Sequence, residues 1–322
     1  SMADERKRES PLLAVVVPCY NEEAVIEDTL IGLIGIIEDL KSSSTIDEGS
    51  FIYCVDDGSR DRTWDCISEA HSRDATVKGL KLTANVGHQN ALLAGLLSVR
   101  ENVDCIITID ADLQDDITII SDMLEKFLEG YDIVYGVRKK RAADSIFKQY
   151  SATFFYKMMH MLGVKIVYNH ADFRLISRRV VDSLSTFSEV NLFLRGIIPL
   201  IGFQSTSVSY ERKKRKAGKT KYPLRKMLSF AWDGITSFSV APLRLVTAIG
   251  AIIFLGTLAL SAWALYSKMV GRVLPGWTST VLPIYFIGGI QVMCIGVIGE
   301  YLGKIYMEVK ARPRYIKDME LF

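Results

Sequence analysis

Two aspartates separated by a single residue, Asp110 and Asp112, directly follow the apolar run Cys105–Ile109. A β-branched run that ends in two acids places both carboxylates at the carboxyl edge of a buried strand, where α/β sheets bind their ligands. Mg²⁺ and Mn²⁺ prefer oxygen ligands and keep open positions for phosphate oxygens. The spacing therefore indicates a divalent cation held against a diphosphate, although solvated acids at a strand end would give the same pattern.

Three more polar segments follow apolar runs of the chain. Pro18–Glu23 contains a proline that ends a strand, the Tyr20 ring on which a base can stack, and side chains that can cap a helix. Asp56–Thr63 supplies carboxylate acceptors for a base N–H or for ribose hydroxyls, with a glycine for the turn. Ordinary turns with helix caps would explain both segments equally well. Asn85–Ala91 is a glycine-containing turn into a helix, in which we interpret His88 as a capping or packing residue rather than a catalyst.

Apolar runs of strand length alternate with stretches of helical periodicity in this part of the chain. Strands are expected at Leu12–Val17, Phe51–Val55, Leu80–Leu82, Cys105–Ile109 and Ile133–Val137. Helices are expected at Glu22–Leu40, Thr63–His71, Gln89–Val99 and Ile119–Leu128. This alternation predicts an α/β fold with a mostly parallel sheet that helices cover on both faces. Because the polar segments follow the strands, the ligand site should lie along the carboxyl edge of that sheet.

Two long stretches nearer the C-terminal end, Leu245–Tyr266 and Val281–Gly299, carry no charged side chain. Each has about 20 residues, which as a helix would span the roughly 30 Å of a bilayer's hydrocarbon core. Neither stretch has a polar face, so a pair of buried core helices is the less favoured interpretation. The sequence predicts two transmembrane helices in a hairpin, because residues 267–280 make only a short connection.

Basic residues gather on both sides of this hairpin, within 212–226 and 304–317, although the net charge of the chain is only +2. The connection offers only Lys268 and Arg272, so the positive-inside rule places the large N-terminal part in the cytoplasm. We therefore expect a multi-pass protein of the inner, or plasma, membrane. Basic residues beside a bilayer attract anionic headgroups or a phosphorylated lipid. The five cysteines show no C-x-x-C spacing and should be reduced thiols.

In their order along the chain, these segments resemble family-2 glycosyltransferases with the GT-A fold. The resemblance is carried by P-C-Y-N-E-E from Pro18, D-D-G-S-R-D-R-T from Asp56, N-V-G-H-Q-N-A-L-L-A-G-L from Asn85 and D-A-D-L-Q from Asp110. Three further segments narrow the resemblance to the polyprenyl-phosphate glycosyltransferases, the group of dolichyl-phosphate mannose synthase and the bactoprenol glucosyl transferases. These segments are Ala171–Leu175, Tyr210–Arg212 and Gly218–Tyr222. The resemblance extends from Leu12 to Arg312.

The resemblance implies four sets of site residues. The nucleotide-sugar would contact Pro18, Tyr20, Asn21, Glu22, Asp56 or Asp57, Asp110, Ala111, Asp112, Gln114 and Arg138. A metal cofactor, Mg²⁺ or Mn²⁺, would be bound by Asp110, Asp112 and Gln114. The acceptor phosphate would meet the basic residues Arg195, Arg212, Lys219 and Lys221. The catalytic residues would be Asp112, Asp172 and Arg174, of which the last two belong to the acceptor-side motif.

The implied reaction is the inverting transfer of one sugar to a polyprenyl phosphate at the cytoplasmic face of the membrane. The sequence lacks the Q-x-x-R-W segment of processive synthases with this fold, which favours a single transfer for each lipid. A phosphate monoester has a second pKa of about 6, so its oxygen is largely anionic at pH 7. We therefore expect Asp172 to position the acceptor or to tune nearby arginines rather than to act as an obligatory general base.

UDP-glucose, or another UDP-sugar, with undecaprenyl phosphate is the expected substrate pair, and GDP-mannose with a dolichyl-type carrier is the alternative. Other classes of protein fit less well. A P-loop hydrolase would need a glycine where Lys213 stands. A nucleic-acid binder is disfavoured because the basic run Arg212–Lys216 lies just before a membrane span. A membrane-anchored, non-catalytic nucleotide-binding scaffold would not need carboxylates at the strand ends.

The expected organisation has five parts. They are a charged, disordered segment without a signal sequence at 1–10, the GT-A domain at 11–221, a juxtamembrane amphipathic segment at 222–242, the transmembrane hairpin at 243–303 and a cytoplasmic tail at 304–322. The aromatic-rich segments Ile146–Val164 and Tyr222–Val240 are interpreted as interfacial helices, with packing on the sheet or on another subunit as the alternative. Two spans leave helix faces that could pack in a homo-oligomer.

Overall fold

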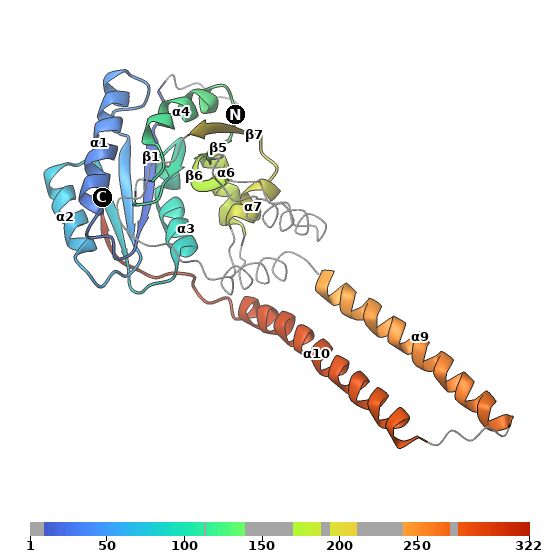
Figure 1. Cartoon of the computed structure of the whole chain (residues 1–322). Coiled ribbons are helices and arrows are strands. Elements are labelled where there is room, and N and C mark those ends of the chain that lie inside the picture. Colours follow the sequence, from blue (N-terminus) through green and yellow to red (C-terminus); the bar gives the residue numbers. More distant parts are fainter. Residues whose placement is uncertain (1–9, 113, 139–169, 188–193, 211–240, 271–275) are drawn as a thin grey trace. The chain divides into compact units, whose positions relative to one another are not determined.

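The structure, a computed structural model, describes residues 10–112, 114–138, 170–187, 194–210, 241–270 and 276–322. Its strands are β1 Leu13–Cys19, β2 Phe51–Asp56, β3 Val77–Leu82, β4 Cys105–Thr108, β5 Ile133–Arg138, β6 His170–Ser177, β7 Ser205–Tyr210 and β8 Lys317–Leu321. They form one eight-stranded sheet in the order β7-β5-β6-β4-β1-β2-β3-β8 (Figure 1). All strands run parallel except β6 and β8, which pair antiparallel with their neighbours. The predicted α/β fold with a mostly parallel sheet is confirmed.

The predicted helices of the sheet region are also present. They are α1 Ile26–Ser42, α2 Thr63–Arg73, α3 His88–Val99 and α4 Ile120–Leu128, and two further helices are α6 Arg178–Ser185 and α7 Leu194–Leu200. α1 begins later than expected, because the carbonyl of Glu22 accepts the N–H groups of Val25 and Ile26 in a turn that precedes the helix. β1 continues through Pro18 to Cys19, so the expectation that this proline ends the strand is wrong.

Helices pack on both faces of the sheet. Alternate residues of β1 point to opposite faces, and Leu13, Val15 and Val17 belong to one buried cluster with side chains of α1, α2 and α4. α3 covers the other face, where a Cβ added to Gly95 would come within 2.6 Å of Val16. Close packing of α3 on the sheet therefore requires glycine at position 95. This packing fixes where α3 begins relative to the strand ends.

The sequence analysis did not predict three of the described strands. β6 holds the buried ionisable residues Asp172 and Arg174 inside the sheet, so its sequence lacks an uninterrupted apolar run. β7 has the mixed sequence STSVSY and pairs with β5. β8 is mostly charged and exposed, and it is a strand because it pairs with β3. Tertiary pairing rather than local pattern creates these strands.

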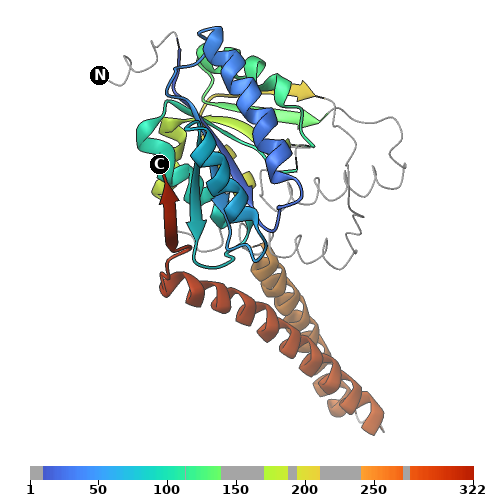
Figure 2. The same cartoon turned by 90° about the vertical axis from the view of Figure 1, so that its left-hand side faces the viewer.

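β8 closes the sheet edge that β3 would otherwise leave open, near the point marked C in Figure 2. The ring of Phe322 packs edge-on against the rings of Phe51 and Tyr53, at centroid distances of 5.9 and 6.1 Å. The Tyr53 hydroxyl donates a hydrogen bond to Glu320, and the Lys78 ammonium lies 4.0 Å from the Phe322 ring centroid. The expected tail at 304–322 is therefore wrong in part, because residues 317–321 belong to the sheet.

The chain divides into two compact units, and the described part of the second comprises residues 241–270 and 276–311. Its described helices are α9 Ala241–Met269 and α10 Trp277–Val309, both of which are longer than the predicted spans. By length and composition, one helical segment of the described residues, Phe286–Val309, could cross a membrane. It overlaps the second predicted span, and the first span, which lies within α9, stays a prediction. The predicted interfacial segments 146–164 and 222–240 lie outside the described residues.

Candidate functional site

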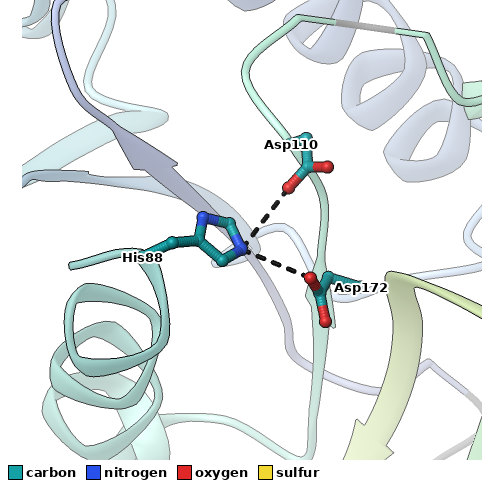
Figure 3. A group of neighbouring side chains, drawn as sticks. All are labelled: His88, Asp110 and Asp172. Atoms are coloured by element: carbon teal, nitrogen blue, oxygen red, sulfur yellow. Dashed lines mark ion pairs between the residues drawn. The ribbon is translucent and has the colours of Figure 1, made fainter. Parts of the chain in front are cut away.

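Three ionisable side chains from different elements meet beyond the carboxyl end of β4 (Figure 3). The Nε2 atom of His88 lies 3.6 Å from Oδ1 of Asp110 and 3.4 Å from Oδ2 of Asp172. Asp110 follows β4, Asp172 lies on β6, and His88 is the first residue of α3. The structure thus brings together Asp110 of the predicted donor-side motif and Asp172 of the predicted acceptor-side motif, with the imidazole between them.

The position of His88 depends on Asp57. The two carboxylate oxygens of Asp57 accept the backbone N–H groups of Val86 and Gly87, at 2.7 and 3.0 Å. Gly87 precedes the helix with a φ of 88°, a conformation that favours glycine. Asp57 therefore fixes the turn that directs His88 toward the two aspartates.

The histidine is a functional candidate that sequence reasoning undervalued. We interpreted His88 as a capping or packing residue, but its side chain is 41% exposed and faces two carboxylates. Its position could have indicated a functional role, because His88 is the first residue of the helix that follows β3, at the sheet edge where the other polar segments lie.

Asp56 and Asp57 have different environments although they are neighbours. Asp56 is fully buried, and its Oδ1 accepts the N–H of Ser59 at 3.2 Å. Within the described residues, Oδ2 of Asp56 has no hydrogen-bond partner. Burial raises the pKa of both carboxyls. Asp56 thus offers an acceptor to a ligand, whereas the oxygens of Asp57 are occupied by the protein backbone.

Asn21 joins the first two strand-end segments to each other. It has a φ of 54°, its N–H donates to the Ser59 hydroxyl at 3.0 Å, and its side-chain oxygen accepts the N–H of Arg60 at 2.9 Å. The N–H of Glu22 donates to the Thr63 hydroxyl at 2.9 Å. Asn21 therefore holds the two segments together. The neighbouring Tyr20 is 42% exposed, and its ring is accessible to a base.

The acidic segment after β4 is held by its own hydrogen bonds. Both the backbone N–H and the side-chain amide of Gln114 donate to the Asp112 carboxylate. The buried carbonyl of Ala111 accepts a hydrogen bond from the Thr29 hydroxyl of α1 at 2.5 Å. These contacts bring Asp112 and Gln114 together, as the predicted metal site requires, and they fix the backbone between the two aspartates.

The donor set fits a divalent cation. Oδ1 of Asp110 is buried and accepts no hydrogen bond from the described residues, so its charge is available to a ligand. Burial raises the pKa of the Asp110 carboxyl, and the neighbouring His88 opposes this rise. A bound cation would favour the ionised carboxylate by the same electrostatic effect.

Asp172 and Arg174 form a buried ion pair on β6. Nη2 of Arg174 lies 2.8 Å from Oδ1 of Asp172, and the two side chains are only 1% and 7% exposed. The hydroxyl of Thr108 on β4 donates to the backbone carbonyl of Asp172. The other carboxylate oxygen of Asp172 faces His88. The pair is thus held rigidly, and Arg174 lies inside the sheet rather than on its surface.

Arg138 is fixed by a second buried acid. Its Nη2 lies 3.0 Å from Oδ1 of Asp115, and its Nε lies 3.1 Å from the Tyr210 hydroxyl. Tyr210 also donates a hydrogen bond to Asp115, and burial raises the pKa of that tyrosine. These contacts connect the segment after Asp112 with the end of β7. Arg138, which is predicted to contact the donor, is thus held by Asp115 and Tyr210.

The predicted acceptor residues are only partly described. Arg212, Lys219 and Lys221, together with Leu113 of the acidic segment, lie outside the described residues, and the side chain of Arg195 does too. The backbone of α7, which carries Arg195, is described. The N–H of Leu194 donates to the side-chain oxygen of Gln89 at 3.3 Å, so the start of α7 lies beside the start of α3.

The cluster of His88, Asp110 and Asp172 lies within the part of the chain that a family profile matches. The profile of "Glycosyl transferase family 2" matches residues 14–185, which include β1 to β6, His88 and all the aspartates described above. The chain is 52% identical to the uncharacterized glycosyltransferase YkoT of Bacillus subtilis, with 98% of this chain and 94% of that protein covered. It is 39% identical to the prophage bactoprenol glucosyl transferase homolog of Escherichia coli, with 94% and 97% covered.

The solved structures that match are more distant in sequence. Glucosyl-3-phosphoglycerate synthase from Mycobacterium tuberculosis, in complex with Mn²⁺, UDP and phosphoglyceric acid, is 17% identical, with a TM-score of 0.47 over 73% of this chain and 80% of that one. The family assignment depends instead on the matched profile and on relatives that cover nearly the whole chain. The chain therefore belongs to glycosyl transferase family 2 and is a glycosyltransferase.

Proposed function

We propose that the chain transfers one glucosyl residue from UDP-glucose to undecaprenyl phosphate, with inversion at the anomeric carbon. The observation that carries the proposal is the match to proteins named bactoprenol glucosyl transferase. The one of Shigella phage SfX is 38% identical, with 94% of this chain and 98% of that protein covered. Because 94% of this chain is covered, the match extends over most of the long C-terminal helices as well as the sheet, which supports a function that uses both parts.

The donor side of the site suits a nucleotide. The accessible ring of Tyr20 can stack on a base, and the buried Oδ2 of Asp56 can accept a base N–H. A divalent cation bound by Asp110, Asp112 and Gln114 would neutralise the charge of the departing diphosphate. The hydrogen bonds between Gln114 and Asp112 keep these donors in place before the substrate arrives.

The acceptor side suits an anion that needs little activation. An oxygen of the lipid phosphate attacks the anomeric carbon, the bond from that carbon to the diphosphate breaks, and UDP leaves with its electron pair. Since a phosphate with a second pKa of about 6 is ionised at pH 7, Asp172 positions the acceptor rather than takes a proton. Its buried pairing with Arg174 supports a positioning role, because the arginine holds one carboxylate oxygen fixed. Arg195, Arg212, Lys219 and Lys221 would supply the positive charge that brings two phosphate-bearing reactants together.

The membrane part of the proposal concerns α9 and α10. We assign them as two spans of the plasma membrane, with the sheet on the cytoplasmic side, where both substrates would be available. The candidate span Phe286–Val309 and the excess of basic residues outside the helix connection support this arrangement. Self-association through the helices is a further part of the proposal, which light scattering of the detergent-solubilised protein would measure.

The deciding experiment offers the purified full-length chain a panel of radiolabelled UDP- and GDP-sugars with a short-chain polyprenyl phosphate. We expect a lipid-soluble product from UDP-glucose, and no product when free polyprenol replaces the polyprenyl phosphate. Transfer from GDP-mannose alone would replace the donor assignment with the mannosyl alternative. Absence of lipid-linked product with every donor, from a folded protein, would contradict the proposal.

A further inference from the structure

The cluster of His88, Asp110 and Asp172 has the dimensions of a metal-binding site. The three candidate ligand atoms lie within 4.8 Å of one another, and the two distances from the imidazole are 3.4 and 3.6 Å. In an octahedral site with bonds of about 2.1 Å, neighbouring ligand atoms lie about 3.0 Å apart and opposite ones about 4.2 Å apart. The cluster therefore needs only a small contraction to surround one cation.

We propose that His88 and Asp172 join Asp110 as ligands of the divalent cation, and that the imidazole makes this site selective for Mn²⁺ over Mg²⁺. The inference rests on the proposed function, since the cation is the one that sugar transfer uses. It adds a nitrogen ligand to a site that the sequence predicts to contain oxygen donors alone.

The chemistry of the ligands supports selectivity. Mg²⁺ strongly prefers oxygen donors and gives up its water reluctantly, whereas first-row transition metals accept imidazole nitrogen readily. Asp172 supplies a carboxylate oxygen to the cluster while its other oxygen accepts from Arg174, an arrangement in which a ligating carboxylate is oriented by a second residue. His88 is oriented through the turn that Asp57 fixes.

A cation at this site would also connect the donor-side motif with the acceptor-side motif. Asp110 belongs to the donor-side motif and Asp172 to the acceptor-side motif, and one cation bound to both would fix the distance between them. The imidazole lies between the two carboxylates (Figure 3). Positioning of this kind accelerates a reaction by holding two reactants in line.

The test measures metal binding without catalysis. Mn²⁺ is added to the full-length chain in detergent at one equivalent, alone and with UDP, and electron spin-echo modulation detects any coordinated ¹⁴N. We expect nitrogen modulation in the wild type, a change to ¹⁵N modulation when histidine is ¹⁵N-labelled, and loss of modulation in His88→Gln. His71→Gln is the matched control, because His71 lies on α2 and its Nδ1 is hydrogen-bonded to the carbonyl of Val77.

Competition between the two ions gives a second measurement. His88→Gln should weaken Mn²⁺ binding by at least about 10-fold, since even the loss of a residue that only orients a metal ligand weakens binding by about 10- to 100-fold, and it should weaken Mg²⁺ binding by less, so the Mn²⁺/Mg²⁺ preference should fall. Absence of nitrogen modulation from the wild type in both samples would overturn the proposal, as would modulation that persists in His88→Gln. An equal loss of both ions would show that the histidine acts only on the local structure. Since the sample with Mn²⁺ alone contains neither nucleotide nor lipid, an error in the assigned substrates leaves its result unaffected.

Discussion

The neighbouring carboxylates of Asp56 and Asp57 should give opposite results when each is changed to asparagine. Oδ2 of Asp56 is buried and has no hydrogen-bond partner within the described residues, so we assign it to the donor. A hydrogen bond to a charged group contributes about 1.5–3 kcal/mol. Its loss in Asp56→Asn should weaken UDP binding by about 10- to 150-fold, because about 1.4 kcal/mol corresponds to a factor of ten.

Asp57→Asn should instead reduce the stability of the fold. Both oxygens of Asp57 accept backbone N–H groups, and an asparagine side chain offers only one acceptor atom for the two. One partly buried N–H loses its partner, at a cost of up to about 1–3 kcal/mol. For a domain of this size, each kcal/mol lowers the melting temperature by about 2–4 °C.

The pH dependence of stability provides an independent check. Burial raises the folded-state pKa of Asp56, so the folded protein binds more protons than the unfolded chain over the range between the two pKa values. The contribution of Asp56 to stability therefore falls as the pH rises through that range. Asp56→Asn cannot ionise and should lose less stability over the same range.

Titration calorimetry with UDP and Mn²⁺, together with thermal unfolding, separates the two effects. The expected result is weak UDP binding with a melting temperature that is not lowered for Asp56→Asn, and a lowered melting temperature for Asp57→Asn. If Asp56→Asn binds UDP as the wild type does, the assignment of its buried oxygen to the donor is refuted. A melting temperature of Asp57→Asn equal to that of the wild type would refute its role in fixing the turn.

Three further predictions concern the metal, the lipid and the mechanism. Asp112→Asn should abolish Mn²⁺- or Mg²⁺-dependent transfer in the radiolabel assay without unfolding the protein. Replacing Lys219 and Lys221 by alanine should raise the KM for polyprenyl phosphate severalfold, with little change in the KM for the sugar nucleotide, because lipid phosphate is their expected ligand. Asp172→Asn should lower kcat by less than about a hundredfold, as expected for a residue that is not the general base. Wild-type activity should decline below about pH 6 as the acceptor phosphate is protonated.

Each of these predictions has a clear contrary result. Full activity of Asp112→Asn, or of the wild type in excess EDTA, would remove the metal assignment. A double alanine variant that affects only sugar-nucleotide binding would move the two lysines to the donor site. An Asp172→Asn protein that binds both substrates yet is inactive at every pH would identify this residue as the general base. Thermal unfolding must accompany that last test, since the buried Arg174 loses its charged partner, at a cost of about 3–5 kcal/mol.

The central strands and the helices between them could be predicted because their sequences repeat with clear periods. β4, for instance, is a run of buried apolar residues that ends at the two aspartates. β6 could not be found in this way, because Asp172 and Arg174 break its apolar pattern while neutralising each other inside the sheet. β8 has no pattern of its own, and its strand conformation depends on pairing with β3, which is distant in the sequence.

In the candidate site, too, some residues could be predicted from the sequence and others could not. Asp56, Asp57, Asp110, Asp112 and Tyr20 could be proposed from residue type and from their positions after strands, whereas Asp172, which lies within β6, is suggested only by the family resemblance. His88 could not, since a single histidine at a helix start has many ordinary functions, and only the tertiary structure shows the two carboxylates around it. The distinction between Asp56 and Asp57 also depends on coordinates, because it arises from which backbone N–H groups reach each carboxylate.

The antiparallel strand β8 has a consequence for biosynthesis. Its residues follow α10 in the sequence, so the ribosome makes them only after both long helices. Throughout that interval the edge of β3 has no partner, and an open strand edge is a site for pairing with other chains. Completion of the sheet therefore waits until the helices have emerged, and the nascent sheet needs protection from aggregation while the helices are being made. A stalled or prematurely terminated chain would keep that edge exposed, even though every residue of the donor site had already been made.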